Sequence, residues 1–347
     1  MITFYSPGVP SSRYTAADLC AGLAGPAVWI DMLEPTEEEE LALEAALGLD
    51  IPTREEMQAI ELSSRLYEER GILFMTATVL TNADTSTPQS AAITFILSAD
   101  KLVTLRYADP AAFTAFRTRR EANLDRYRTS YDFMGGLIDA IIERVADILE
   151  AVGASMDRVS LRVFGGSTAP VVSLNTPRTR NPLSRTQRGE ARKARQRDFV
   201  EILTRIGGLS DLVSRARESL VSFVRVVAFF RESRKDHPAA QDALVHSQTV
   251  TADLASLSDH ATFLSGKVGF LLDATLGMIN NEQNAIIKIL SVAALVFLPP
   301  TLVAGIYGMN FDVMPELRWA HGYPFALGLM VLAAVVPYVF FRRKGWL

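Results

Sequence analysis

The sequence predicts an α/β soluble domain, built from a mixed sheet with flanking helices, followed by a long stalk helix and two membrane-spanning helices. Three observations support this fold class. Short runs rich in β-branched and aromatic residues come first, and long helical patterns follow them. A nearly regular apolar repeat then continues without proline through residues 239–298. Two segments close to the C-terminus are long, apolar and almost uncharged, as membrane helices are.

The overall composition excludes some classes of protein. The chain has 347 residues, a formal net charge of −4 and a pI of about 5.7, so nucleic acid is not expected as a partner. The single cysteine, Cys20, excludes an internal disulfide and a multi-cysteine metal site. The mean hydropathy of +0.16 fits a protein that is partly embedded in a bilayer. Residues 1–12 lack the basic and apolar segments of a signal peptide, so we expect the N-terminal part to stay in the cytoplasm.

Residues 1–238 are predicted to form the cytoplasmic α/β domain with a helical part. Thr36 is expected to cap a helix, and Glu39, three residues later, would complete a capping box. The glutamates around Glu39 then stabilise the positive end of that helix rather than bind metal. The segments expected as strands are 27–33, 71–81, 91–97 and 101–107.

The second half of this domain is predicted to be helical apart from one loop. A helical pattern runs from 110 to about 164, and a flexible basic loop is expected over 165–189, where glycine and proline are frequent. Between 165 and 197 the chain carries eight basic residues against one acidic residue, Glu190. Such a run can touch anionic lipid or nucleic acid, but a solvated loop leading into a charged helix is the simpler interpretation. The role of this segment stays open.

Two further helices lead towards the membrane. The first covers 199–232 and is expected to be interrupted near Gly207-Gly208. The second is the stalk helix, 239–285, whose apolar residues follow close to a heptad repeat, and it is expected to continue directly into the first membrane helix. An apolar seam of this length needs partner helices from the same chain or from sister subunits.

The first membrane helix is predicted over 286–308. This segment carries one charge, Lys288, and a helix of its length covers roughly 35 Å, enough for a hydrocarbon core of about 30 Å. One narrow face holds small or neutral-polar side chains, which are typical either of a helix-packing seam or of a pore lining. The residues that share this face are Asn284, Ile287, Ser291, Ala294, Leu298, Thr301 and Gly305.

The second membrane helix is predicted over 324–341, a segment without charge. The basic tail 342–347 follows it at once and marks the cytoplasmic side by the positive-inside rule. Two spans return the chain to the side that it left, so both termini are expected in the cytoplasm. The connecting segment, 309–323, is then an external loop.

Several motifs resemble one known family. Tyr307-Gly308-Met309-Asn310-Phe311 is followed by Met314-Pro315-Glu316-Leu317, and this pair of motifs is similar to the signature of the CorA family of divalent-cation channels. Four other stretches also resemble the family, and with them the resemblance covers nearly the whole chain: VWID at 28–31 with Glu34-Pro35, IIKI at 286–289, FLPPTLVA at 297–304 and RRKGWL at 342–347.

The resemblance implies a homopentamer in the inner membrane, with the first span of each copy lining a central axis. It implies that Gly308, Met309 and Asn310 form the selectivity element. It also places Asn284 at a polar ring near the cytoplasmic mouth and Asp273 at an acidic ring below it. Relative to compact family members, the loop at 165–189 looks like an insertion.

The residues themselves suit a hydrated ion. Mg²⁺ loses its water reluctantly, so a ring of neutral amides at Asn310 can hydrogen-bond the ion's water shell without the tight hold of carboxylates. Asn284 and Thr301 offer further polar contacts, and Asp312 and Glu316 in the loop would raise the local cation concentration unless they are ordinary solvated side chains. The side chains expected to form closing apolar rings are Ile287, Leu290 and Leu298. The metal-contacting candidates are Asn310, Asn284 and Asp273.

These inferences predict a channel that needs no cofactor and is not an enzyme. The four histidines form no metalloprotease motif or close cluster, and no phosphate-binding glycine loop is present. A divalent ion gains about 2.3 kcal/mol per charge for each 100 mV on entering a negative interior. By the resemblance, Mg²⁺ is both the transported ion and the cytosolic regulator, with Co²⁺ and Ni²⁺ as further candidates. No motif places the regulatory carboxylates.

Two alternatives remain at this stage. The chain is a transporter of Zn²⁺ or another transition metal in the same superfamily, or it is a membrane-anchored sensor or scaffold whose spans only hold it in place. The intact motif at 307–311 argues against the first alternative. A polar stripe that ends in a filter-like tripeptide argues against the second.

Overall fold

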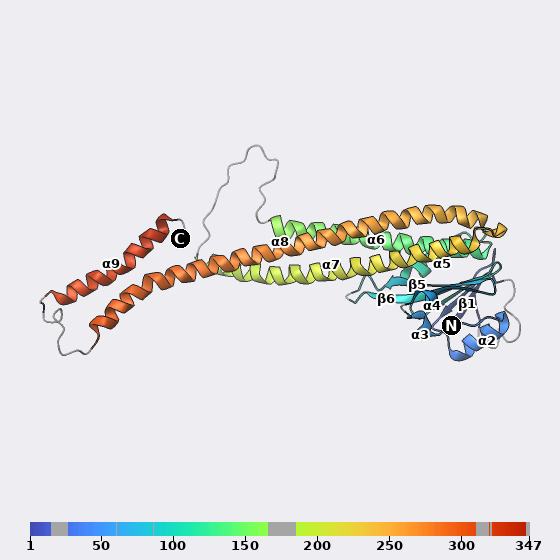
Figure 1. Cartoon of the computed structure of the whole chain (residues 1–347), viewed down its shortest axis with the longest axis horizontal. Coiled ribbons are helices and arrows are strands. Elements are labelled where there is room, and N and C mark those ends of the chain that lie inside the picture. The colour runs from blue at the N-terminus through green and yellow to red at the C-terminus, as the bar shows by residue number, and fades with distance from the viewer. Residues whose placement is uncertain are drawn as a thin grey trace, which may run out of the picture. The chain divides into compact units, whose positions relative to one another are not determined.

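The computed structural model describes residues 1–14, 27–59, 61–85, 87–165, 185–309, 319 and 321–344, without the side chains of 62, 165 and 185–197. The chain divides into two units, Met1–Leu272 and Asp273–Leu347. Figure 1 shows the strands and most of the helices of the first unit and the helices of the second.

The first unit contains the predicted mixed sheet. Its seven described strands lie in the order β2-β1-β3-β7-β6-β5-β4; β3 and β7 run parallel, and the other neighbouring pairs run antiparallel. The four strands expected from the sequence are β3, β5, β6 and β7, and the three short strands β1, β2 and β4 were not anticipated. The bounds are β1 Ile2–Tyr5, β2 Ser12–Tyr14, β3 Trp29–Leu33, β4 Leu66–Glu69, β5 Ile72–Thr81, β6 Gln89–Leu97 and β7 Leu102–Arg106.

Helices cover both faces of this sheet because successive strand residues point to opposite sides. On β3, Ile30 and Met32 join an apolar cluster that includes Leu43 of α2 (Glu37–Leu47) and Met57 of α3 (Arg54–Met57). Trp29 points the other way and contacts aromatic rings of α5 (Ala111–Ala122) and α6 (Ser130–Gly165). The short helix α4 (Leu62–Arg65) leads into β4.

The start of α2 confirms the predicted capping box. The Thr36 hydroxyl accepts a hydrogen bond from the Glu39 backbone N–H at 3.3 Å, and the Glu39 carboxylate accepts one from the Thr36 N–H at 3.1 Å. Two of the otherwise unpaired N–H groups of the helix terminus are thereby satisfied.

Helix α7 (Arg185–Arg234) corrects two expectations. It begins inside the range predicted as loop, 165–189, of which residues 166–184 lie outside the described part of the chain. It also continues without interruption through Gly207 and Gly208. Both glycines are exposed, whereas the neighbouring Ile206 and Leu209 are buried, so tertiary packing on this helix outweighs the loss of about 1 kcal/mol that each glycine brings.

Within the first unit, α6 and α7 run side by side, and the first part of α8 packs along α6 (Figure 1). The contacts between α6 and α8 (Gln241–Tyr307) include the ion pair of Lys267 with Asp157 at 2.6 Å and the stacked rings of Phe164 and Phe270. Phe164, near the end of α6, thus lies against α8. The apolar repeat predicted for the stalk therefore finds partner helices within the same chain.

Helix α8 follows a single 3₁₀ turn, η1 (Pro238–Ala240), and shows no break between residues 285 and 286. The predicted stalk and first span thus belong to one helix, which also contains Pro299 and Pro300. The second unit adds α9 (Gly322–Arg343). The segment from Pro238 to Tyr307 and helix α9 are each long and apolar enough to cross a membrane, and only 6% of each apolar window is buried, which separates them from the core helices of a soluble protein.

Candidate functional site

The face of α8 that the sequence singled out is uncovered in the single chain. Each residue of the predicted stripe is exposed, including Ile287 at 58% and Leu298 at 67%, and Leu290 beside it is 70% exposed. Large apolar side chains in this state need lipid or another protein chain against them. The exposed members of the stripe are Asn284, Ile287, Ser291, Ala294, Leu298, Thr301 and Gly305.

The opposite face of the same helix is better covered. Val292 is buried at 4%, and Val296 and Val303, which share its side at helical spacing, are half-buried. Helix α8 therefore has two unlike faces within the second unit. One carries the more covered valines, and the other carries the exposed small and polar residues.

Thr301 presents an acceptor on the stripe. Its hydroxyl donates to the Phe297 carbonyl one turn earlier at 2.8 Å, so the hydroxyl proton is used inside the helix. The oxygen keeps its lone pairs for an outside donor. The water shell of a cation presents hydrogens outward, and an acceptor of this kind suits it.

The end of α8 is shaped by Gly308. Its N–H donates to the Ala304 carbonyl at 2.9 Å, and a Cβ added at this position would lie 3.0 Å from that same carbonyl oxygen. A side chain at this position would therefore be crowded against the last turn, and a small shift of the backbone would be needed to accommodate it. Met309 follows, is 49% exposed, and borders a shallow groove with Leu298 and Thr301. Asn310, Asp312 and Glu316 lie outside the described residues.

Asn284 and Asp273 are both exposed on α8, and neither forms a hydrogen bond or ion pair within the described part of the chain. Their polar atoms are thus available to water, ions or another chain. Pro299 and Pro300 have no N–H, so the carbonyls of Leu295 and Val296 lose their usual helical donors. That loss makes this part of α8 the easiest place to bend.

The first unit, Met1–Leu272, is called the soluble unit from here on, and it contains a buried polar network around the motif at 28–31. Arg106 on β7 donates two hydrogen bonds to Asp31 on β3, from Nε to Oδ1 at 2.9 Å and from Nη2 to Oδ2 at 2.8 Å. The parallel register sets Asp31 beside Thr104, whose hydroxyl donates to Oδ1 at 2.8 Å and accepts from the Trp29 indole at 3.0 Å. The motif is therefore structural: it fixes the centre of the sheet.

Electrostatics favour this network strongly. Burial alone lowers the pKa of Arg106, but the hydrogen bonds and charge of Asp31, with a smaller contribution from Asp109, outweigh it and raise the pKa above its ordinary value. Arg106 also lies over the Phe113 ring at 4.5 Å. Both charges of the pair are withdrawn from water, with 0% and 2% of their side chains exposed.

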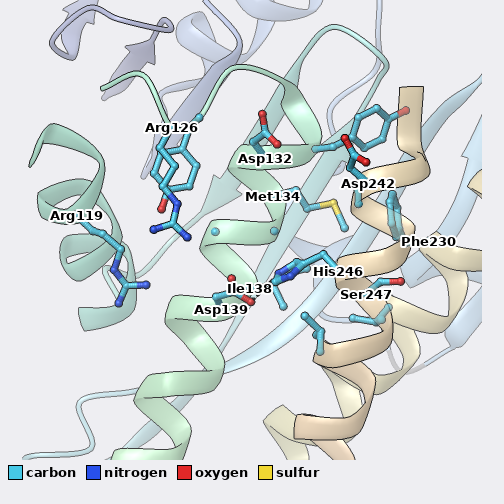
Figure 2. Close-up of a pocket in the computed structure, with 17 residues that line it drawn as sticks. Arg119, Arg126, Asp132, Met134, Ile138, Asp139, Phe230, Asp242, His246 and Ser247 are labelled. Atoms are coloured by element: carbon cyan, nitrogen blue, oxygen red, sulfur yellow. Dashed lines mark hydrogen bonds and ion pairs between the residues drawn. The ribbon is translucent and has the colours of Figure 1, made fainter. Parts of the chain in front are cut away.

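A cavity of ≈ 210 Å³ lies where α5, α6, α7 and α8 meet in the first unit. Figure 2 shows Asp139 of α6 facing His246 of α8 across it; the Nε2 to Oδ1 distance is 3.0 Å. Burial raises the pKa of Asp139, and the charge and hydrogen bond of His246 oppose that rise. The pair links α6 to α8. Within the described residues, no group of three or more His, Cys, Asp or Glu side chains is arranged to hold a metal.

Sequence reasoning did not find the partners in these two clusters. Asp31 was noticed only as part of a motif, and Arg106, Asp139 and His246 were not singled out. Strand alternation places Asp31 on the buried side with Trp29, which is the one signal that could have marked it as needing a cation. Asp139 and His246 meet only through packing of distant helices.

The architecture defines a class: a two-span α-helical membrane protein with a mixed-sheet soluble unit and a long connecting helix that leaves one face uncovered. A family model described as "CorA-like Mg2+ transporter protein" matches residues 25–174 and 185–343. The chain is 35% identical over 322 residues to a magnesium transport protein CorA of Pasteurella multocida, covering 92% of each chain. The corresponding protein of Haemophilus influenzae is 34% identical over 322 residues, and that of Salmonella typhimurium 33%, with the same coverage. The chain belongs to this CorA-like family.

Solved structures agree on the fold. The complete structure of the CorA magnesium transporter from Methanocaldococcus jannaschii matches with a TM-score of 0.70 at 16% identity, covering 100% of this chain and 99% of that one. The structure of the full-length CmaX protein matches with a TM-score of 0.62 at 16% identity, covering 92% and 88%. The family is one of transporters, which agrees with the prediction that the chain is not an enzyme.

Proposed function

We propose that this chain is one subunit of a homopentameric Mg²⁺ channel in the inner membrane, with α8 of each copy lining the axis. The observation that carries the proposal is the uncovered stripe on α8, which holds small, polar and apolar side chains without charge. One helix cannot enclose a passage, so several copies must contribute. Relatives of the same family at 33–35% identity are magnesium transport proteins, and this supports Mg²⁺ as the transported ion.

Selection acts on the hydrated ion in this proposal. Five Asn310 amides at the outer mouth accept hydrogen bonds from the water shell of Mg²⁺, so the ion need not be stripped. Gly308 supports the mechanism because a Cβ at this position would lie 3.0 Å from the Ala304 carbonyl oxygen, a crowded contact that glycine avoids. Asp312 and Glu316 raise the cation concentration outside.

Closure acts through apolar rings on the same stripe and directly beside it. Ile287, Leu290 and Leu298 are exposed towards the proposed axis, and a ring of such side chains expels water when it narrows. Asn284 and Asp273 add a polar and an acidic ring at the cytoplasmic side. Cytosolic Mg²⁺ favours the closed state, and its site in the soluble unit remains to be located.

The membrane potential drives the flux without a nucleotide. A divalent ion gains about 4.6 kcal/mol across 100 mV, twice the value of about 2.3 kcal/mol for a single charge. With Arg342 and Arg343 in the last turn of α9 on the inner side, both termini are cytoplasmic.

The test uses purified full-length protein in liposomes with an internal Mg²⁺ indicator. Wild-type protein should pass Mg²⁺, and Asn310→Ala and Asn284→Ala should each lower the flux. Asn281→Ala is the matched control, since Asn281 is also exposed on α8 but lies off the stripe. No flux with wild-type protein alone would favour a scaffold, and wild-type flux in Asn310→Ala would refute the filter.

Ion preference is resolved in the same liposomes. Mg²⁺ flux should be inhibited by Co²⁺ and Ni²⁺, which carry similar water shells, and much less by Zn²⁺. Zn²⁺ flux that exceeds Mg²⁺ flux at equal concentration would make the chain a transition-metal transporter instead.

A further inference from the structure

A second cavity in the soluble unit has an unbalanced positive charge. It has a volume of ≈ 700 Å³ and lies at the edge of the sheet, between α7 and the segment from α3 to β4. Three arginines line it, Arg65 from α4 and Arg217 and Arg225 from α7, against one carboxylate, Glu218. None of these residues takes part in the proposed transport.

The cavity exists because β5 loses its neighbour. Strand β4 pairs with β5 only from Ile72 to Met75, so from Thr76 onward one edge of β5 has no strand beside it among the described residues. Helix α7 lies against this edge, and Ser222 of α7 accepts a hydrogen bond from the Thr78 N–H at 2.9 Å. At this edge β5 therefore contacts a helix and not another strand, which leaves space for a cavity.

Arg65 is fixed in place but only partly satisfied. Its Nη2 donates to the Thr78 hydroxyl at 2.8 Å, whereas its Nε is buried and has no hydrogen-bond partner. Burial lowers the pKa of Arg65; Glu218 raises it in part, and Arg225 lowers it further. A buried donor without a partner is unfavourable, and an added anion would satisfy it.

The two arginines of α7 are likewise uncompensated. Arg217, Val221 and Arg225 follow at four-residue spacing and so share one face of the helix. Neither arginine forms a hydrogen bond or an ion pair with any part of the chain that the structure describes. Glu218 forms no ion pair with either arginine, its carboxylate accepts a hydrogen bond from the Ser90 hydroxyl at 3.0 Å, and a single carboxylate cannot balance three guanidinium charges.

We propose that this cavity binds a phosphorylated metabolite of about nucleotide size, held by Arg65, Arg217 and Arg225. Guanidinium groups match phosphate oxygens in charge and planar geometry. The volume falls within the range of about 300–1,000 Å³ typical of small-molecule sites and is far larger than one phosphate group needs. The hydroxyl oxygens of Ser214 and Ser90 line it as acceptors for sugar hydroxyls, since their protons are donated to the Ser210 carbonyl and to Glu218. Met57, Leu66 and Val221 supply an apolar wall. The proposal is independent of the transport function.

The experiment measures equilibrium binding to purified full-length protein in detergent, with EDTA present so that no metal ion bridges ligand and pore. The probes are ATP, ADP, glycerol 3-phosphate, inorganic phosphate and adenosine. ATP and ADP should bind, adenosine should not, and added salt should weaken binding. Binding of glycerol 3-phosphate or inorganic phosphate but not of ADP or ATP would show that the cavity takes only a small phosphate group and would overturn the nucleotide-sized ligand.

The variant is Arg217→Gln/Arg225→Gln, with Arg205→Gln as the matched control from an exposed position of the same helix outside the cavity. Both arginines are exposed, so the double variant should fold and elute as the wild type does. It should bind ATP at least about tenfold more weakly, while Arg205→Gln should bind normally. Equal affinity in all three proteins, or no binding of any phosphate compound to the wild type, would overturn the proposal.

Discussion

The two units treat large apolar side chains in opposite ways. In Met1–Leu272, Trp29 and Phe116 are wholly buried and the strands of one sheet share their core. In Asp273–Leu347, Phe297 is 72% exposed, and most of the large apolar side chains of α8 and α9 are exposed as well. The first unit buries its core by itself. The second leaves its large apolar side chains exposed, and in the proposed channel lipid and sister copies would cover them.

The same contrast holds for polar groups. Asp31 and Arg106 are buried and satisfy each other within the chain, whereas Asn284 and Thr301 are exposed. Buried polar groups with internal partners serve stability, and exposed polar groups on an apolar helix serve contact with something outside. Changes in the first unit should therefore affect unfolding, and changes on the stripe should affect flux.

The largest expected effect comes from breaking the buried pair. Arg106→Met leaves the Asp31 carboxylate buried without its cation and should destabilise the soluble unit by about 3–5 kcal/mol. Urea unfolding of the full-length protein, followed by tryptophan fluorescence, measures the change.

The control removes an exposed pair. Arg119→Gln breaks the ion pair of Arg119 with Glu143, whose side chains are 36% and 56% exposed, and should cost less than about 1 kcal/mol. The double variant Asp31→Leu/Arg106→Met should recover part of the loss, because no unpaired charge remains. Similar losses for Arg106→Met and Arg119→Gln would erase the contrast.

A second prediction concerns the end of α8. Gly308→Ala places a methyl group against the Ala304 carbonyl and should displace Met309 and the residue after it. We expect a fall of about tenfold in Mg²⁺ flux, the equivalent of about 1.4 kcal/mol, with unchanged urea unfolding of the soluble unit. Gly328→Ala on α9 has open space around it and should have no effect on flux. Normal flux in Gly308→Ala would remove the steric argument.

A third prediction tests the apolar rings. Leu298→Ser makes a predicted closing ring polar, so water should remain in it and the Mg²⁺ flux at high internal Mg²⁺ should rise by about twofold or more. Val303→Ser, on the opposite face, should leave the flux under these conditions unchanged. An equal rise of the Mg²⁺ flux in both variants would indicate that either substitution loosens α8 in general, and it would contradict the closing ring at Leu298.

The smallest expected effect is a pH dependence in the soluble unit. Burial raises the pKa of Asp139 above its ordinary value of 3.8, so the folded state favours the neutral carboxyl. Its contribution to stability is complete below pH 3.8 and declines as pH rises through the raised pKa. As the pH rises from 3.8 through the raised pKa of Asp139, the unfolding temperature of Asp139→Asn relative to wild type should therefore increase.

The comparison is repeated in a His246→Gln background, which removes the attraction that opposes the shift. Arg119 and Glu143 face the same carboxylate and stay unchanged in both backgrounds. In that background the relative gain of Asp139→Asn should be larger. A constant difference across the interval would show that Asp139 keeps its ordinary pKa.

Local and periodic features could be predicted from the sequence, and long-range partners could not. The capping box joins Thr36 and Glu39, which are only three residues apart. The stripe of α8 depends on helical spacing alone. The break at Gly207-Gly208 was predicted wrongly because propensity ignores the buried Ile206 and Leu209. Arg65 and Arg225 line one cavity only because one strand ends early, and no local pattern in the sequence indicates that.

The central claim is that the exposed stripe of α8 faces a water-filled passage shared by several copies. Its most direct test is accessibility of single cysteines in a Cys20→Ser background, with Mg²⁺ flux into liposomes measured before and after a charged, water-soluble thiol reagent. The account predicts that Leu298→Cys is blocked by the reagent and that Val303→Cys, on the opposite face, is not. Block at 303 with none at 298 would contradict it.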